Sequence, residues 1–216
     1  MQITIREPGS AITHFIGMMM AIFAAVPLLV KAGVTAGTRT MFAMGIFMAS
    51  MILLYGASAT YHSVNLTGRA LRIFRKLDHM MIFVLIAGSY TPICLIVLGG
   101  SAGYTMLAVV WGIALVGMLI KACWITCPKW FSSIIYIAMG WVCVFVFRQL
   151  LHTLPTSGFL WLLAGGIIYT AGGIIYALKL PIFNAKHKTF GSHEVFHLFV
   201  MGGSICHFIF MYLYVA

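Results

Sequence analysis

The chain has very little charge, and acidic residues are almost absent from it. Only 7% of its 216 residues are charged, and 13 Lys and Arg stand against 3 Asp and Glu. With 62% hydrophobic residues and a mean hydropathy of +1.07, the composition excludes a soluble globular protein and requires lipid around most of the chain. The net charge of +10 does not predict a nucleic acid partner, because the basic residues lie in short loops suited to topology control and contact with anionic headgroups.

Three further absences exclude other classes of protein. The five Cys form no ligand-like cluster and are interpreted as reduced thiols acting as small apolar groups, although the spacing of Cys123 and Cys127 leaves a metal or redox pair open. No cleavable signal peptide pattern precedes the first long apolar run, which begins near Ser10 and is long enough to span. The connections between the apolar runs are too short for a soluble domain.

Long apolar runs dominate the chain, and a bilayer requires roughly 20 apolar residues for each spanning helix. Seven runs are predicted to span: residues 11–30, 41–62, 78–99, 103–122, 131–150, 158–179 and 193–215. The predicted fold class is therefore all-α and integral to the membrane, a seven-transmembrane-helix bundle that forms one domain over residues 1–216. The pairs Gly165–Gly166 and Gly172–Gly173 in the sixth run predict close helix packing rather than ligand binding.

The distribution of Lys and Arg predicts the orientation of the bundle. One side of the membrane is expected to hold Arg6, Arg69, Arg72, Arg75, Lys76, Lys121, Lys129, Lys179, Lys186 and Lys188, and the other Lys31, Arg39 and Arg148. Because basic residues gather on the cytoplasmic side, we expect a cytoplasmic N-terminus and an extracytoplasmic C-terminus. The helical spacing of Arg69, Arg72 and Lys76 also predicts a short interfacial helix before the third span.

Five polar residues are out of place in such a chain. Ser58 and His62 lie in the last turns of the second span, Asp78 opens the third, and His193 and His197 open the seventh. The predicted orientation puts all five in the cytoplasmic third of the membrane. Polar and ionisable residues at this depth are costly and usually mark a functional site.

The spacing of these residues favours a metal site. His193 and His197 are four residues apart and share one helix face, as Ser58 and His62 do. Two imidazoles on one face and a third from another helix suit zinc, with a fourth position left for water. Asp78 could hold that water or orient a ligand, with Ser58 beside it. The alternatives are histidines that extend singly to headgroups, and pairing of Asp78 with a basic neighbour: Arg75, Lys76 or His79.

Two other histidines are expected to lie outside this centre. His79 follows Asp78 directly and therefore points about 100° away around the helix. His207 comes 14 residues after His193, about 21 Å further along the helix axis, where an interhelical hydrogen bond is the simpler interpretation.

Residues 193–197 read HEVFH, which matches the metalloprotease pattern H-E-x-x-H. In that pattern the Glu is the general base, but Glu194 points about 100° away from His193 around the helix. The third imidazole and a carboxylate are supplied by other helices, and soluble peptides would reach this depth poorly. We therefore interpret the motif as H-x-x-x-H and expect no protease.

Five segments of the chain together resemble the hemolysin III family, the bacterial branch of the progestin and adipoQ receptor (PAQR) group that includes the adiponectin receptors. The matching segments are ITHFIG (12–17), SATYH (58–62), LDHMMIFVLIAGSYTP (77–92), YIAMGW (136–141) and SHEVFHLFVMGGSICHF (192–208). The resemblance implies zinc bound by three histidines, here His62, His193 and His197. It also implies that Asp78 contacts the water on the zinc, with Ser58 beside it, and it gives no role to Glu7 or His14.

Two classes of function remain open. In the first, zinc polarises a lipid carbonyl, Asp78 accepts a proton and Ser58 helps to stabilise an oxyanion, so that the protein is a ceramidase-like hydrolase of amide- or ester-linked lipids in membrane lipid homeostasis. In the second, zinc is structural and the protein is a non-enzymatic sensor of membrane state. A pore-forming hemolysin is less favoured, because the sequence has no amphipathic insertion segment. Membrane lipids are the expected partners, and the bacterial cell membrane is the expected location of this multi-pass chain.

Overall fold

The computed structural model describes residues 5–178 and 190–216, and the regular structure in these two segments is entirely helical. The elements are α1 (Pro8–Thr35), α2 (Thr38–Ser63), α3 (Gly68–Pro92), a π-helical turn η1 (Ile93–Leu98), α4 (Gly100–Cys123), α5 (Lys129–Gly140), a 3₁₀ segment η2 (Trp141–Val146), α6 (Phe147–Thr153), α7 (Thr156–Leu178) and α8 (Ser192–Tyr214). Seven stretches in the described segments are long and apolar enough to cross a membrane, with α3 and η1 forming one span and α5 to α6 another. The prediction of an all-α, seven-span membrane protein is confirmed.

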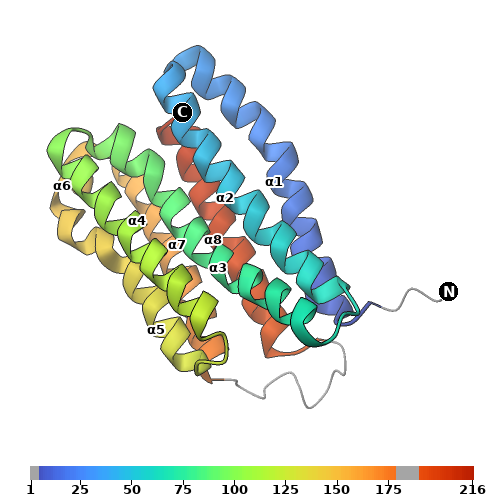
Figure 1. The fold of residues 1–216 in the computed structure, drawn as a ribbon. Helices are drawn as coiled ribbons and strands as arrows, with labels where there is room; N and C mark the ends of the chain where they lie inside the picture. The colour runs from blue at the N-terminus through green and yellow to red at the C-terminus, as the bar shows by residue number, and fades with distance from the viewer. Residues whose placement is uncertain (1–4, 179–189) are drawn as a thin grey trace.

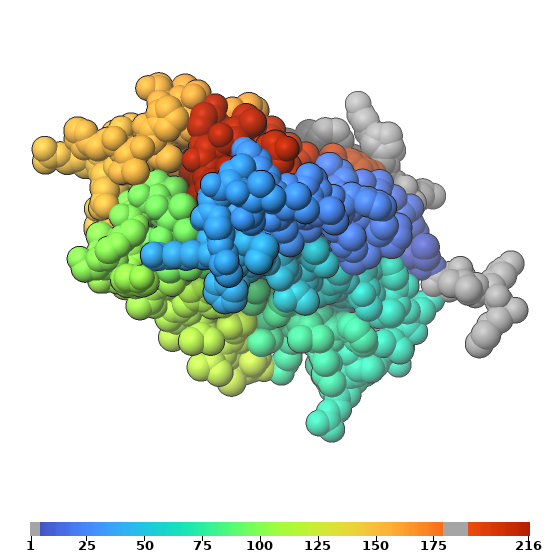
Figure 2. Space-filling view, turned by 90° about the horizontal axis from the view of Figure 1, so that it is seen from above, coloured from blue at the N-terminus to red at the C-terminus, as the bar shows by residue number. Residues whose placement is uncertain are grey.

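The spans stand side by side, and in this view α8 passes behind α2 and α3 (Figure 1). Viewed along the bundle, the end of α8 lies between α7 and the first two helices (Figure 2). The start of α1 and the end of α8 are at opposite ends, as an odd number of spans requires (Figure 1). The basic residues predict which end of the bundle faces the cytoplasm, and this orientation stays a prediction. Three of those residues, Lys179, Lys186 and Lys188, lie outside the described segments.

The helix that carries Asp78 begins earlier than predicted, at Gly68. The three basic residues expected to form a separate interfacial helix lie on the first turns of α3 itself, so that prediction was wrong. No helix-breaking residue separates Gly68 from Asp78, and helix formation continues through the stretch. The Lys76 ammonium donates a hydrogen bond to the Ala122 carbonyl at the end of α4, which ties this extension to the neighbouring span.

The fifth span is interrupted, although one continuous helix was predicted over residues 131–150. α5 ends at Gly140 and continues as the 3₁₀ segment η2 before α6 begins. The Tyr90 hydroxyl of α3 reaches this break, where it donates to the Gly140 carbonyl at 2.5 Å and accepts from the Cys143 N–H at 3.0 Å. The side chain thereby satisfies backbone groups that the break would leave without partners.

Glycines bring α7 and α8 close together, as the sequence predicted. A Cβ added to Gly165 would lie 2.3 Å from Cδ2 of His207, and one added to Gly172 would lie 2.7 Å from an α8 side chain. His207 also makes the expected interhelical contact, from Nε2 to the Leu162 carbonyl at 3.3 Å. Gly166 differs, because an added Cβ would meet nothing within 4 Å.

One end of the bundle brings together helices that are remote in sequence. The start of α1 meets the end of α2, where the Glu7 N–H donates to the His62 carbonyl at 3.0 Å. The same part of α1 meets the start of α8, where the Ser10 hydroxyl donates to the Glu194 carboxylate. These contacts converge where the sequence placed its polar residues.

Candidate metal centre

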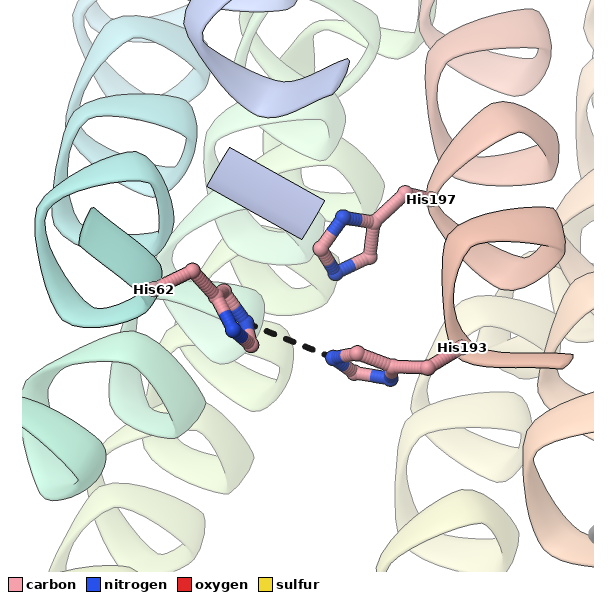
Figure 3. Close-up of side chains that lie close together, drawn as sticks. All are labelled: His62, His193 and His197. Atoms are coloured by element: carbon pink, nitrogen blue, oxygen red, sulfur yellow. Dashed lines mark hydrogen bonds between the residues drawn. The ribbon is translucent and has the colours of Figure 1, made fainter. Parts of the chain in front are cut away.

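Three imidazoles meet at this end of the bundle. His62 comes from the last turn of α2, and His193 and His197 come from successive turns of α8 (Figure 3). One ligand atom from each lies within 4.8 Å of the others. His62 and His197 are 2% and 1% exposed, and His193 is partly buried. The sequence therefore predicted correctly that these three side chains come together.

The spacing of one pair of ring nitrogens fits a tetrahedral metal. Nε2 of His62 lies 3.3 Å from Nε2 of His193 (Figure 3). Two imidazole nitrogens bound tetrahedrally to zinc at about 2.0–2.1 Å are separated by about 3.3–3.4 Å. Three neutral imidazoles are also a donor set that zinc accepts readily. The residues present thus fit the metal that the motif predicts.

The start of α1 contacts two of the three imidazoles, which the sequence did not predict. Nδ1 of His62 is hydrogen-bonded to the Glu7 carboxylate, and this bond lowers the pKa of the Glu7 carboxyl to about 2. Nδ1 of His197 lies 3.1 Å from the Thr13 hydroxyl. His14 stacks on His197 with ring centroids 3.5 Å apart. The order of the spans could have indicated these contacts, because α1 begins at the end of the bundle where α2 finishes.

As expected, Asp78 and Ser58 lie at the same end of the bundle, and both line the same cavity. The Asp78 carboxylate pairs with Nδ1 of its neighbour His79 at 3.2 Å. This pairing is one of the alternatives that the sequence left open, and His79 stays outside the group of three histidines, as expected. Ser58 is fully buried and its side chain lies close to the Asp78 carboxylate, although the hydroxyl makes no hydrogen bond of good geometry within the described residues.

Glu194, the acid inside HEVFH, is engaged in the local helix structure. Its carboxylate accepts from the Gly191 N–H at 2.7 Å, which completes a capping box at the start of α8, and it also accepts from the Ser10 hydroxyl. These two bonds fix the first turn of α8, which carries His193. Glu194 acts here as a helix cap.

A largely apolar cavity lies beside the histidines. His193, His197, Asp78 and Ser58 line one part of it, and His207, further along α8, lines another. Between them the walls come mainly from α3, α5 and α7 and carry aliphatic and aromatic side chains. The polar residues therefore open onto a space suited to an apolar chain.

Fold and site together define a class: a seven-span membrane protein in which three histidines from the second and last spans gather at one end, beside an apolar cavity. The sequence model of the family described as Haemolysin-III related matches residues 2–208. The chain belongs to this family.

Known relatives agree with this assignment. Hemolysin-3 of Bacillus cereus is 36% identical over 210 residues, which cover 97% of this chain and 92% of that protein. The Hemolysin-3 homolog of Bacillus subtilis (strain 168) is 36% identical over 212 residues, covering 98% and 95%. The adiponectin receptor protein of Drosophila melanogaster is 23% identical over 237 residues, covering 94% of this chain and 49% of the receptor. The predicted relationship to both the bacterial family and the receptor group is confirmed.

Proposed function

We propose that the protein is a zinc-dependent hydrolase of amide- or ester-linked membrane lipids that acts in membrane lipid homeostasis. The observation that carries this proposal is the cavity, because it joins two of the clustered histidines, Asp78 and Ser58 to an apolar space. A lipid could place its chain along the cavity and its carbonyl at the polar end. With the orientation predicted from the basic residues, this end lies near the cytoplasmic face, where the basic start of α3 would contact anionic headgroups.

In the proposed reaction, each residue of the site would have a separate role. Zinc held by His62, His193 and His197 would supply Lewis acidity toward the lipid carbonyl and toward water. Asp78 would accept the proton of the attacking water and return it to the leaving group. The buried Ser58 hydroxyl would donate a hydrogen bond to the carbonyl oxygen as negative charge develops there. The apolar walls would hold the acyl chain and limit access of bulk water.

A second function has one observation in its favour. Asp78 is paired with His79 rather than with a clustered histidine, which suits a zinc ion that only joins α2 to α8. In that case the protein would sense the state of the membrane and turn over no lipid. Turnover measurements separate the two functions.

Removal of the metal is expected to abolish lipid turnover. Purified protein in nanodiscs would be incubated with ceramides and phospholipids, and released fatty acid would be measured by mass spectrometry. Treatment with a chelator should remove the activity, and added zinc should restore it, because the proposed reaction depends on Lewis acidity. Two results would refute the proposed hydrolase activity. One is turnover that survives complete removal of zinc, and the other is a zinc-loaded protein that turns over none of the lipids tested.

Gly166→Leu is expected to shorten the longest acyl chain that the protein accepts. Gly166 lines the cavity, and an added Cβ there meets nothing within 4 Å, so the larger side chain would occupy the cavity without disturbing α7. Turnover of long-chain substrates should fall at least about tenfold relative to short-chain ones, since each buried methylene contributes about 0.8 kcal/mol. Gly112→Leu is the control, because its position on α4 is also open. Equal losses for all chain lengths would contradict this role of the cavity.

A further inference from the structure

The first two turns of α1 contact every helix that carries a candidate ligand, yet they provide none themselves. We propose that this segment, Glu7 to His14, orients the metal ligands: it fixes which ring nitrogen of His62 and of His197 faces the centre, and it holds the turn that carries His193. The inference rests on the zinc site proposed above, and it assigns a role to residues that the ligand motif leaves out.

Glu7 sets the tautomer of His62. A glutamate carboxylate accepts hydrogen bonds, so the hydrogen on the His62 ring lies on Nδ1, which faces it. Nε2 of the neutral ring then carries a free lone pair. That atom lies 3.3 Å from Nε2 of His193, on the side where the ligand atoms gather.

Thr13 sets the tautomer of His197 in the same way. The single hydroxyl hydrogen of Thr13 is directed to backbone carbonyls of its own helix, at 3.0 Å from both Gly9 O and Ser10 O. The hydroxyl oxygen can therefore only accept from the imidazole, which places the hydrogen of His197 on Nδ1. Nε2 of His197 is again left as the free ligand atom.

Two further contacts fix positions rather than tautomers. The Ser10 hydroxyl holds the Glu194 carboxylate, and Glu194 caps the turn of α8 that presents His193. The His14 ring lies against the His197 ring, with an interplanar angle of 10°. Ser10 and His14 are four residues apart, so both face α8 from one side of α1.

The expected effect is a change in zinc affinity. Hydrogen-bond partners of ligand histidines orient the ring and raise its basicity, and their loss weakens metal binding by about 10–100-fold. Glu7→Ala and Thr13→Val should each show a loss of this size. Glu7→Gln should keep most of the affinity, because the amide oxygen still accepts the Nδ1 hydrogen although it lacks the charge.

The experiment measures zinc affinity by competition with a chelator on the full-length protein in detergent, with thermal unfolding of the metal-free protein measured in parallel. Thr40→Val is the matched control, because Thr40 is a buried threonine that donates to the Ala36 carbonyl at the opposite end of the bundle. Cobalt(II) spectra provide a second readout. The visible bands should change in Glu7→Ala and Thr13→Val, whereas Thr40→Val should match the wild type.

The outcomes distinguish this inference from the proposed function. If the wild type binds zinc and both Glu7→Ala and Thr13→Val bind it equally well, the role of α1 is refuted while the metal site stands. If the wild type binds no zinc, the site and this inference fall together. If Thr13→Val lowers the zinc affinity and lowers the thermal stability of the metal-free protein to the same extent, the result would also count against an orienting role.

Discussion

His62→Ala is expected to remove zinc from the purified protein, from about one ion per chain to none after dialysis. His62 is the only one of the three clustered imidazoles that comes from α2, and without it two ligands on one face of α8 remain. Zinc sites with four ligands bind with about 10–16 kcal/mol, so losing one of three imidazoles should weaken binding by at least about 100-fold. Metal content by mass spectrometry measures the result.

The matched control is His152→Ala, which removes an exposed imidazole on α6. It should leave the zinc content unchanged. Helix content and elution volume establish whether the His62 variant keeps its bundle. A folded His62→Ala protein that retains its zinc would show that the three imidazoles are not the ligands.

Asp78→Asn is expected to lower lipid turnover by about 10²–10⁴-fold while zinc content stays the same. The amide keeps the shape of the side chain on the cavity wall but cannot accept a proton. The control is again His152→Ala, the exposed imidazole on α6, and its turnover should stay within a few fold of wild type. Turnover unaffected by Asp78→Asn would exclude Asp78 as the base and leave the proposal without its proton acceptor.

The sequence predicted the spans and the shared location of the clustered residues, for physical reasons that operate along the chain. Hydropathy defines a span locally, because each helix must satisfy its own backbone in lipid. The alternation of span direction then assigns His62, Asp78, His193 and His197 to one end of the bundle without any knowledge of packing. The structure agrees with that assignment.

Contacts between helices were harder to predict. The Glu7 and Thr13 contacts depend on how α1 is rotated against α2 and α8, which hydropathy does not define because α1 is apolar on most of its faces. The break in the fifth span depends on a hydroxyl from α3, so no local signal in residues 131–150 reveals it. The pairing of Asp78 with His79 was one of several alternatives in the sequence, and the choice among them depends on side-chain torsions that residue spacing does not define.

The separation of the ligands along the chain has a consequence for biosynthesis. His62 and His193 are 131 residues apart, so at synthesis rates of about 5–20 residues per second the ribosome needs roughly 7–26 s to proceed from the first ligand to the second. During that interval α1 and α2 are already made, and both Glu7 and His62 belong to this early hairpin. The carboxylate can therefore hold the imidazole in place before α8 exists, and a metal at the proposed site could bind all three imidazoles only after the last span has been inserted.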